Sequence, residues 1–288
     1  MTMDVGRQAE RFVRWCEAVE ESALSTIALG DRIAYHSQDP LISLAVAAGV
    51  TRRVRLATSV VALPVRDTGI VAKEVASLDV LSGGRFSFGI GISSRPDDFA
   101  ALGKPWPGRL SRFEGQVADL RRIWQGAPLA DGAPPIGPPP LTSGGPALIY
   151  GALTEPALRR AGRIADGIMT WSFVPDAEAQ RTSIGIVREE WARHARPGRP
   201  AISAAMYFAL GPNAETKLRA YLAAYYDYSE SARPQIERVP THGEKIIESA
   251  IRSYAEAGVE ELLFAAPDDS VEQVERLSEL VSRIGYGV

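Results

Sequence analysis

The chain has 288 residues, of which 45% are hydrophobic and 23% are charged, and its formal net charge is -3. This length and composition are typical of one globular domain with a large core, which we expect to span residues 1–288, and they exclude a disordered or fibrous chain. A weakly acidic chain offers no basic surface, so we expect no nucleic-acid partner.

The cysteine and hydropathy patterns favour a cytoplasmic protein. Cys16 is the only cysteine, which excludes an internal disulfide and suits a reducing compartment. No apolar run approaches the roughly 20 residues of a membrane span, and the N-terminus lacks a signal-peptide core, so we expect no membrane association. His36, His194 and His242 are far apart without cysteine neighbours, so we expect no metal site.

Helical and strand patterns alternate along the whole chain, beginning with a helix near Gly6. Because buried β-branched runs alternate with helical periodicity, we expect a parallel sheet with crossover helices. The seven strands that we predict begin near Leu24, Val54, Phe86, Ala147, Gly167, Ala201 and Glu261.

Residues 54–91 show this organisation most clearly. Residues 54–61 and 86–90 are apolar enough for strands buried on both faces, and apolar residues recur at helical spacing over residues 70–81. The two strands must therefore be parallel and joined by a right-handed crossover.

Three stretches interrupt the pattern. Residues 92–108 contain three prolines and predict a long loop at the C-terminal end of a strand. Residues 127–146 contain seven prolines and cannot form a regular element. We interpret them as a surface crossing, because the alternating pattern resumes at once at Ala147. Residues 225–241 predict an irregular insertion.

The run from Ser77 to Phe86, SLDVLSGGRF, followed by Gly89-Ile90-Gly91, resembles the bacterial-luciferase-like superfamily of flavin- and deazaflavin-dependent oxidoreductases. Further landmarks of that superfamily occur in order along the chain. The resemblance implies an α/β fold, the TIM (β/α)8 barrel. Such a barrel needs a strand before the first helix, and residues 1–5 are short and polar. Either this first strand is stunted, or it lies before the first residue of the sequence.

The reaction in a TIM barrel takes place at the C-terminal ends of the strands. Asp31 matches the aspartate of the superfamily's Gly-Asp-His motif. The resemblance therefore implies that Asp31 is a catalytic or cofactor-binding carboxylate beside the reactive ring. The alternative is that Asp31 is the N-cap of a helix. Arg32 replaces the histidine and is unsuited to donate a proton, because guanidinium stays charged. His36, one helical turn further on, is the candidate acid or base. Its alternative is a surface imidazole.

Two further strand ends are candidate ring contacts. The resemblance implies a non-proline cis peptide between Ser59 and Val60, forming a bulge behind the ring, although an ordinary strand end remains the alternative. Ser93 follows a strand and presents a small hydroxyl to the same region.

Arg85 starts that strand at the opposite end of the barrel, so we expect a structural arginine paired with a carboxylate.

Residues 150–157, YGALTEPA, resemble the superfamily's phosphate-binding turn. The amides at a helix start are unpaired and favour an anion, so the candidate cofactor contacts are Gly151, Ala152, Leu153 and Thr154. Glu155 competes for these amides unless Arg159 or Arg160 offsets it. The alternative is an ordinary capped helix. Trp171 either walls the pocket or belongs to the core.

The resemblance implies an oxidoreductase that uses coenzyme F420, an 8-hydroxy-5-deazaflavin, to move hydride to or from a small organic substrate. One alternative is a reduced-FMN-dependent monooxygenase with a separate flavin reductase. Another is a non-catalytic flavin-binding homologue. The resemblance also implies a homodimer. Residues 89–93, GIGIS, match a dinucleotide-binding motif only weakly, because the third glycine and the following helix are missing.

Overall fold

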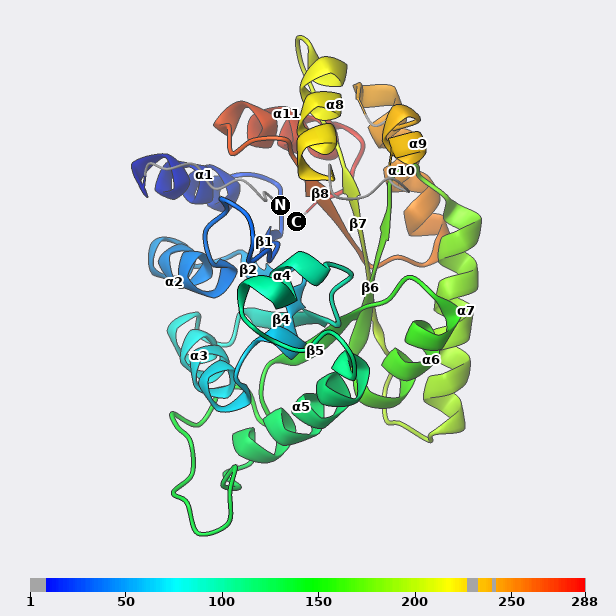
Figure 1. Cartoon of the computed structure of the whole chain (residues 1–288). Coiled ribbons are helices and arrows are strands. Elements are labelled where there is room, and N and C mark those ends of the chain that lie inside the picture. Colours follow the sequence, from blue (N-terminus) through cyan, green and yellow to red (C-terminus); the bar gives the residue numbers. More distant parts are fainter. Residues whose placement is uncertain (1–8, 227–232, 240–241, 288) are drawn as a thin grey trace.

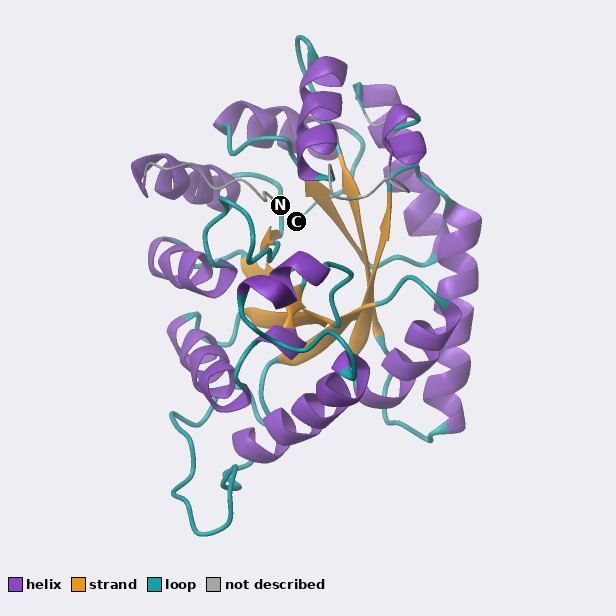
Figure 2. Ribbon diagram, in the orientation of Figure 1, coloured by secondary structure: helices purple, strands orange, loops and turns teal. Residues whose placement is uncertain are grey.

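Parallel strands alternate with helices in the computed structural model, which describes residues 9–226, 233–239 and 242–287. The strands gather at the centre and the helices surround them (Figures 1 and 2). The strands are β1 (Thr26–Leu29), β2 (Arg55–Thr58), β3 (Val61–Ala62), β4 (Phe86–Gly91), β5 (Ala147–Gly151), β6 (Gly167–Ser172), β7 (Ala201–Tyr207) and β8 (Glu261–Ala265). The helices are α1 (Ala9–Glu21), α2 (Pro40–Val50), α3 (Thr68–Leu81), α4 (Pro96–Ala101), α5 (Arg109–Trp124), α6 (Glu155–Ile164), α7 (Ala177–Arg193), α8 (Ala214–Tyr225), α9 (Arg233–Glu237), α10 (Glu244–Ala257) and α11 (Val271–Arg283), with a 3-10 turn η1 (Leu63–Val65).

The strands form one parallel sheet that curves into a nearly closed barrel. The order is β1-β2-β4-β5-β6-β7-β8, and β3 pairs with the upper half of β4. This arrangement confirms the predicted TIM-type barrel and its seven strands. The strand predicted from Val54 is divided into β2 and β3 at Ser59 and Val60. The described residues contain no ladder between β1 and β8, and the strand expected before the first helix falls outside them.

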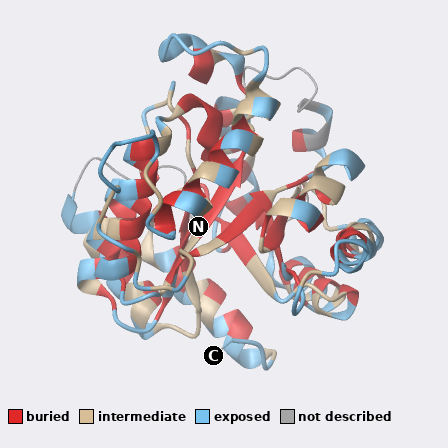
Figure 3. Ribbon diagram, turned by 90° about the horizontal axis from the view of Figure 1, so that it is seen from below, coloured by how far each residue is buried: buried red, intermediate tan, exposed pale blue. Residues whose placement is uncertain are grey.

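The core has two parts, because successive side chains of a strand point to opposite faces. Larger side chains face the helices, as Phe88 of β4 does. The barrel interior is filled by smaller ones, and its buried members are Ala28, Ala57, Ile149, Met169, Ala205 and Leu263. Figure 3 shows the buried strands inside the exposed outer faces of the helices. None of the described helices is long and apolar enough to span a membrane.

The proline-rich residues 127–146 contain no helix or strand, as predicted. The fully buried carboxylate of Asp79 anchors this loop to the end of α3. Asp79 accepts hydrogen bonds from the Thr142 amide at 2.7 Å and the Thr142 hydroxyl at 2.8 Å. Residues 92–108 include α4, and residues 225–241 include α9, so neither stretch is irregular throughout.

The prediction that Arg85 pairs with a carboxylate is wrong. Its guanidinium donates to the carbonyl oxygens of Val54 at 2.6 Å and Thr51 at 3.0 Å, and to the Thr51 hydroxyl at 3.1 Å. Burial lowers the pKa of Arg85. The carbonyls that accept these bonds lie where α2 ends and β2 begins, so Arg85 closes the base of the barrel and is structural.

Candidate functional site

Asp31 follows β1 at the C-terminal rim of the barrel, and its side chain is only 1% exposed. Its Oδ2 accepts a hydrogen bond from the Ala62 amide at 3.0 Å, and its Oδ1 lies 2.9 Å from Nη2 of Arg66. The same Nη2 lies 2.7 Å from Oδ2 of Asp39. Asp31 therefore holds the segment that follows Ser59 and Val60 in place.

Burial raises the pKa of Asp31, while the Arg66 guanidinium and the Ala62 amide favour its charged form. Burial would lower the pKa of Arg66, but the attraction of Asp31 and Asp39 outweighs it and raises that pKa. Asp39 caps α2 by accepting from the Leu41 amide at 2.9 Å. The N-cap alternative for Asp31 is thus wrong, because Asp39 takes that position.

The peptide bond between Ser59 and Val60 is cis, as the resemblance implied. Two glycines make room for the Val60 side chain. A Cβ built on Gly91 would lie 2.9 Å from Val60 Cγ2, and one built on Gly151 would lie 3.0 Å from the same atom. We call Val60 with Gly91 and Gly151 the valine seat. It joins the ends of β4 and β5 to the β2–β3 break.

Met169 of β6 links the valine seat to the start of the predicted phosphate-binding turn. The Ser59 hydroxyl donates to the Met169 sulfur at 3.0 Å, a weak hydrogen bond. The Ala152 amide donates to the Met169 carbonyl at 3.1 Å. Ser59, Val60, Gly151 and Ala152 are therefore neighbours at the rim, although their strands are far apart in the sequence.

The turn from Gly151 to Thr154 leads directly into α6. Thr154 is the N-cap residue, but its side chain makes no capping hydrogen bond, and Leu153 is 64% exposed. Glu155 is paired with Arg159 at 2.8 Å. Of the two arginines considered, Arg159 therefore offsets the Glu155 charge, whereas Arg160 pairs with Glu114. The first turn of α6 therefore offers the N–H groups of Glu155 and Ala157 to an anion, since Pro156 has none.

Trp171 lies beside the buried Tyr207 of β7. The centroids of the two rings are 4.4 Å apart, and the rings pack edge to face. Burial raises the pKa of Tyr207 well above its usual value, so this phenol stays neutral. Nε1 of Trp171 is buried and has no hydrogen-bond acceptor among the residues that the structure describes. The tryptophan forms part of an aromatic wall and carries a donor available to a ligand.

Arg32 is buried rather than free to reach a substrate. It donates to the Tyr225 carbonyl at 3.0 Å, and its guanidinium lies 4.6 Å from the Tyr35 ring centre. His36 is exposed, and its ring centre lies 4.0 Å from that of Tyr35. Cation–π stacking thus fixes Arg32 in the rim, while His36 stands on its solvent side.

Ser93 follows β4 in a left-handed conformation with φ of 59°. Its hydroxyl accepts a hydrogen bond from the Arg95 amide at 3.1 Å, so it stabilises the turn into α4.

Arg66, Met169 and Tyr207 were not predicted as site residues, because nothing in the local sequence pattern indicates which distant side chains they contact. Within the described ranges, no three His, Cys, Asp or Glu side chains form a potential metal site.

The chain is similar to several known oxidoreductases. It is 34% identical over 154 residues to an F420-dependent glucose-6-phosphate dehydrogenase from Beutenbergia cavernae, which covers 48% of this chain and 43% of that enzyme. The fold matches a coenzyme F420-dependent tetrahydromethanopterin reductase from Methanopyrus kandleri with a TM-score of 0.75 and 16% identity, over 98% of each chain.

A second structural neighbour is the oxygenating constituent of 3,6-diketocamphane monooxygenase from Pseudomonas putida, in complex with FMN. Its TM-score is 0.72 at 13% identity, over 99% of this chain and 98% of the other. These structural likenesses establish a shared fold. Residues 2–282 match the family described as luciferase-like monooxygenase. With a parallel barrel and a match over nearly its whole length, the chain belongs to the luciferase-like monooxygenase family of oxidoreductases.

Proposed function

We propose that this protein is an oxidoreductase that binds coenzyme F420 at the C-terminal rim and transfers hydride to or from a small organic substrate. The observation that carries the proposal is the valine seat. Its packing puts the Ser59–Val60 segment next to the turn at Gly151, within reach of the open first turn of α6. A flat ring system with an anionic tail suits this combination.

The residues at the rim fit such a coenzyme. The backbone amides from Leu153 to the start of α6 would hold a phosphate, since the helix dipole favours an anion there, while the Ala152 amide is already bonded to the Met169 carbonyl. The Ser59–Val60 backbone would support the ring, and Trp171 would contribute a wall and its Nε1 donor, which meets no acceptor in the described part of the chain. When bound, the coenzyme supplies the hydride chemistry, while the protein supplies orientation and electrostatics.

The other rim residues would hold the coenzyme in position, exclude solvent and transfer a proton. The ion pairs from Asp31 through Arg66 to Asp39 connect the end of β1 with β3 and α2, so they fix the support behind the ring. The neutral, buried Tyr207 and its aromatic neighbours exclude water from one side. His36 is the candidate proton donor or acceptor, because an imidazole ring can donate a proton from one nitrogen and accept one at the other, and this side chain is exposed.

A reduced-FMN-dependent monooxygenase is the second candidate, favoured by the family's description and by the FMN-bound neighbour. It would need a flavin reductase as partner. Titrating the purified protein with F420 and, separately, with FMN while following fluorescence quenching distinguishes the two. We expect saturable quenching of F420 at micromolar or lower concentration. FMN binding with oxygen consumption would favour the monooxygenase, and binding of neither compound would indicate a non-catalytic homologue.

A further inference from the structure

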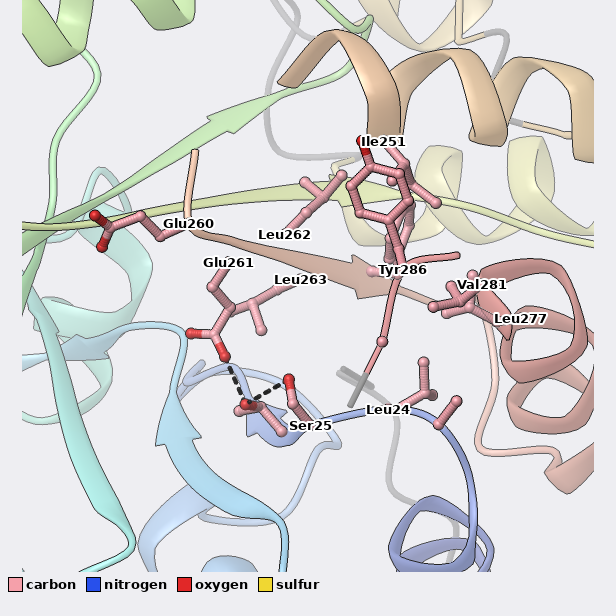
Figure 4. Close-up of a pocket in the computed structure, with 14 residues that line it drawn as sticks. Leu24, Ser25, Ile251, Glu260, Glu261, Leu262, Leu263, Leu277, Val281 and Tyr286 are labelled. Atoms are coloured by element: carbon pink, nitrogen blue, oxygen red, sulfur yellow. Dashed lines mark hydrogen bonds between the residues drawn. The ribbon is translucent and has the colours of Figure 1, made fainter. Parts of the chain in front are cut away.

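A cavity of about 370 Å³ lies beside the starts of β1 and β8 (Figure 4). Its lining includes Thr26 and Glu261, the first residues of these two strands, and its other walls are mainly apolar, as at Leu262 and Val281. The coenzyme contacts proposed above lie instead at the C-terminal ends of the strands. A substrate in this cavity would therefore be out of reach of the coenzyme, so the substrate must bind at the rim.

The uppermost layer of the barrel interior is uneven. Met169 of β6 and Ala205 of β7 belong to the interior cluster, and side chains two residues apart on a strand share a face. Trp171 and Tyr207 are therefore the next interior side chains on these two strands. The corresponding positions at the ends of β1, β2, β4, β5 and β8 carry small residues, which are Gly30, Ser59, Gly91, Gly151 and Ala265. One side of the rim is thus built from small residues and the other from large aromatic rings.

The side with small residues contains the valine seat, where the coenzyme ring would bind, and Trp171 borders it. Val60 and Trp171 pack against the same interior cluster. In the sheet, Gly151 pairs with Met169, which lies two residues before Trp171 on β6. A molecule placed against the indole would therefore lie next to the coenzyme ring, which is the position that hydride transfer requires of a substrate.

Trp171 belongs to a wall of four aromatic side chains. The ring centre of Phe173 lies 6.4 Å from that of Trp171 and 5.1 Å from that of Tyr226. The hydroxyl groups of Tyr207 and Tyr226 lie 3.1 Å apart, so these two phenols are hydrogen-bonded to each other. Aromatic rings pack favourably on other rings, either offset or edge to face. The wall therefore favours a flat, unsaturated substrate.

The indole N–H of Trp171 adds a polar requirement to this wall. Its Nε1 is buried and meets no acceptor among the residues that the structure describes. In contrast, Nε1 of Trp124 donates to the Ala72 carbonyl at 3.1 Å, and Nε1 of Trp191 donates to the Pro197 carbonyl at 3.3 Å. An indole N–H can only donate, and leaving a buried donor without a partner is costly. A ligand that fits here should therefore bring an acceptor atom.

We infer that the substrate is a small aryl ketone or aldehyde whose carbonyl oxygen accepts a hydrogen bond from Nε1 of Trp171, an inference that rests on the proposed function. In the reducing direction, the carbonyl carbon gains a hydride from the reduced coenzyme. The oxygen gains a proton from solvent, into which oxidation of the coenzyme releases one, and the product is an alcohol; the reverse reaction oxidises that alcohol. Negative charge develops on the oxygen as the hydride arrives, and a fixed donor stabilises it. Trp171 is thus a catalytic residue.

The indole N–H signals in proton–nitrogen NMR spectra test this contact, because each of the five tryptophans gives one signal. The signal that Trp171→Phe lacks belongs to Trp171; if this variant does not fold, phenylalanine variants of the other tryptophans assign it by elimination. The protein is titrated, with and without F420, with acetophenone and with α-methylstyrene, a flat analogue that has CH2 in place of the oxygen. We expect only acetophenone to move the Trp171 proton downfield, while the signals of Trp124 and Trp191 stay in place. An equal response to both probes, or saturation by neither at millimolar concentration, would overturn the inference.

Binding affinities from equilibrium dialysis provide a second test. Trp171→Phe keeps an aromatic ring and deletes the donor, so its loss of affinity for acetophenone should exceed its loss for α-methylstyrene by about fivefold. Equal losses for the two probes would overturn the inference. Quenching of F420 fluorescence in the same samples separates this inference from the proposed function. Absent quenching beside a responsive Trp171 signal would refute the coenzyme, whereas normal quenching beside an unresponsive Trp171 signal would refute the substrate contact.

Discussion

Arg66 is the group whose removal should disturb the rim most. The change Arg66→Met keeps an unbranched apolar side chain and deletes the guanidinium that contacts Asp31 and Asp39. Breaking a buried ion pair costs about 3–5 kcal/mol, because the remaining charge is uncompensated. Asp31 is 1% exposed and Asp39 is 31% exposed, and an exposed pair contributes at most about 1 kcal/mol. We therefore expect a loss of about 3–4 kcal/mol at neutral pH, almost all of it from Asp31.

The pH dependence of this loss has a definite sign. Burial already raises the pKa of Asp31, and losing Arg66 raises it further. A carboxyl with a folded pKa above its unfolded value stabilises the fold while protonated, and that contribution disappears as the pH rises through the folded pKa. The cost of Arg66→Met should therefore be greatest at neutral pH. It should shrink as the pH falls from the pKa of Asp31 in the variant to the lower pKa of Asp31 in the wild type, since the unfolded pKa is common to both proteins.

Urea unfolding of the wild type and the variant at pH 7 and at pH 5 measures both effects. Arg122→Met is the matched control, because Arg122 pairs with Asp119 on the surface at 3.0 Å and should cost less than about 1 kcal/mol. Adding Asp31→Asn to Arg66→Met should recover most of the lost stability. A single variant within 1 kcal/mol of wild type, or a double variant no more stable than the single, would refute the reasoning.

Three smaller changes follow from the packing. Gly89→Ala would place a Cβ 1.9 Å from the Thr58 carbonyl oxygen, so urea unfolding should show a loss of about 2–3 kcal/mol; wild-type stability would contradict this close approach. Burial raises the pKa of Cys16 to about 12, so the thiol should react with a disulfide reagent at pH 8 only after unfolding, and rapid labelling of the native protein would disprove its burial. Thr142→Val leaves one oxygen of the buried Asp79 without its hydroxyl donor and should cost about 1–3 kcal/mol, whereas an unchanged denaturation midpoint would show that the loop is held otherwise.

The barrel could be predicted from the sequence because its strands are buried on both faces. Continuous β-branched runs separated by helical periodicity leave few topologies open, and all seven predicted strands are present. The break between β2 and β3, in contrast, could not be predicted from the strand pattern. The residues around Ser59 only permit it, and the expectation came from family resemblance. The space that Val60 needs is supplied by Gly91 and Gly151, which a strand pattern does not reveal.

The rim was harder to predict, because its contacts join distant parts of the chain. Asp31 stands out by following a strand, but its partner Arg66 is 35 residues away, beyond a 3-10 turn. Arg32 is held by Tyr225, 193 residues away. The carboxylate partner expected for Arg85 was wrong for a related reason, since carbonyl groups at the end of a helix attract a cation without any acidic residue and leave no mark in the sequence.

Coenzyme binding by a variant of the valine seat tests the central claim most directly. Gly151→Val would push a branched side chain against Val60, whereas Gly185→Val in α7 places the same side chain in open space. In fluorescence titrations with F420, we expect the wild type and Gly185→Val to bind equally and Gly151→Val to bind at least about tenfold more weakly, a change of about 1.4 kcal/mol. Equal affinity of all three proteins would contradict a coenzyme site built on this seat, as would a wild type that does not bind F420.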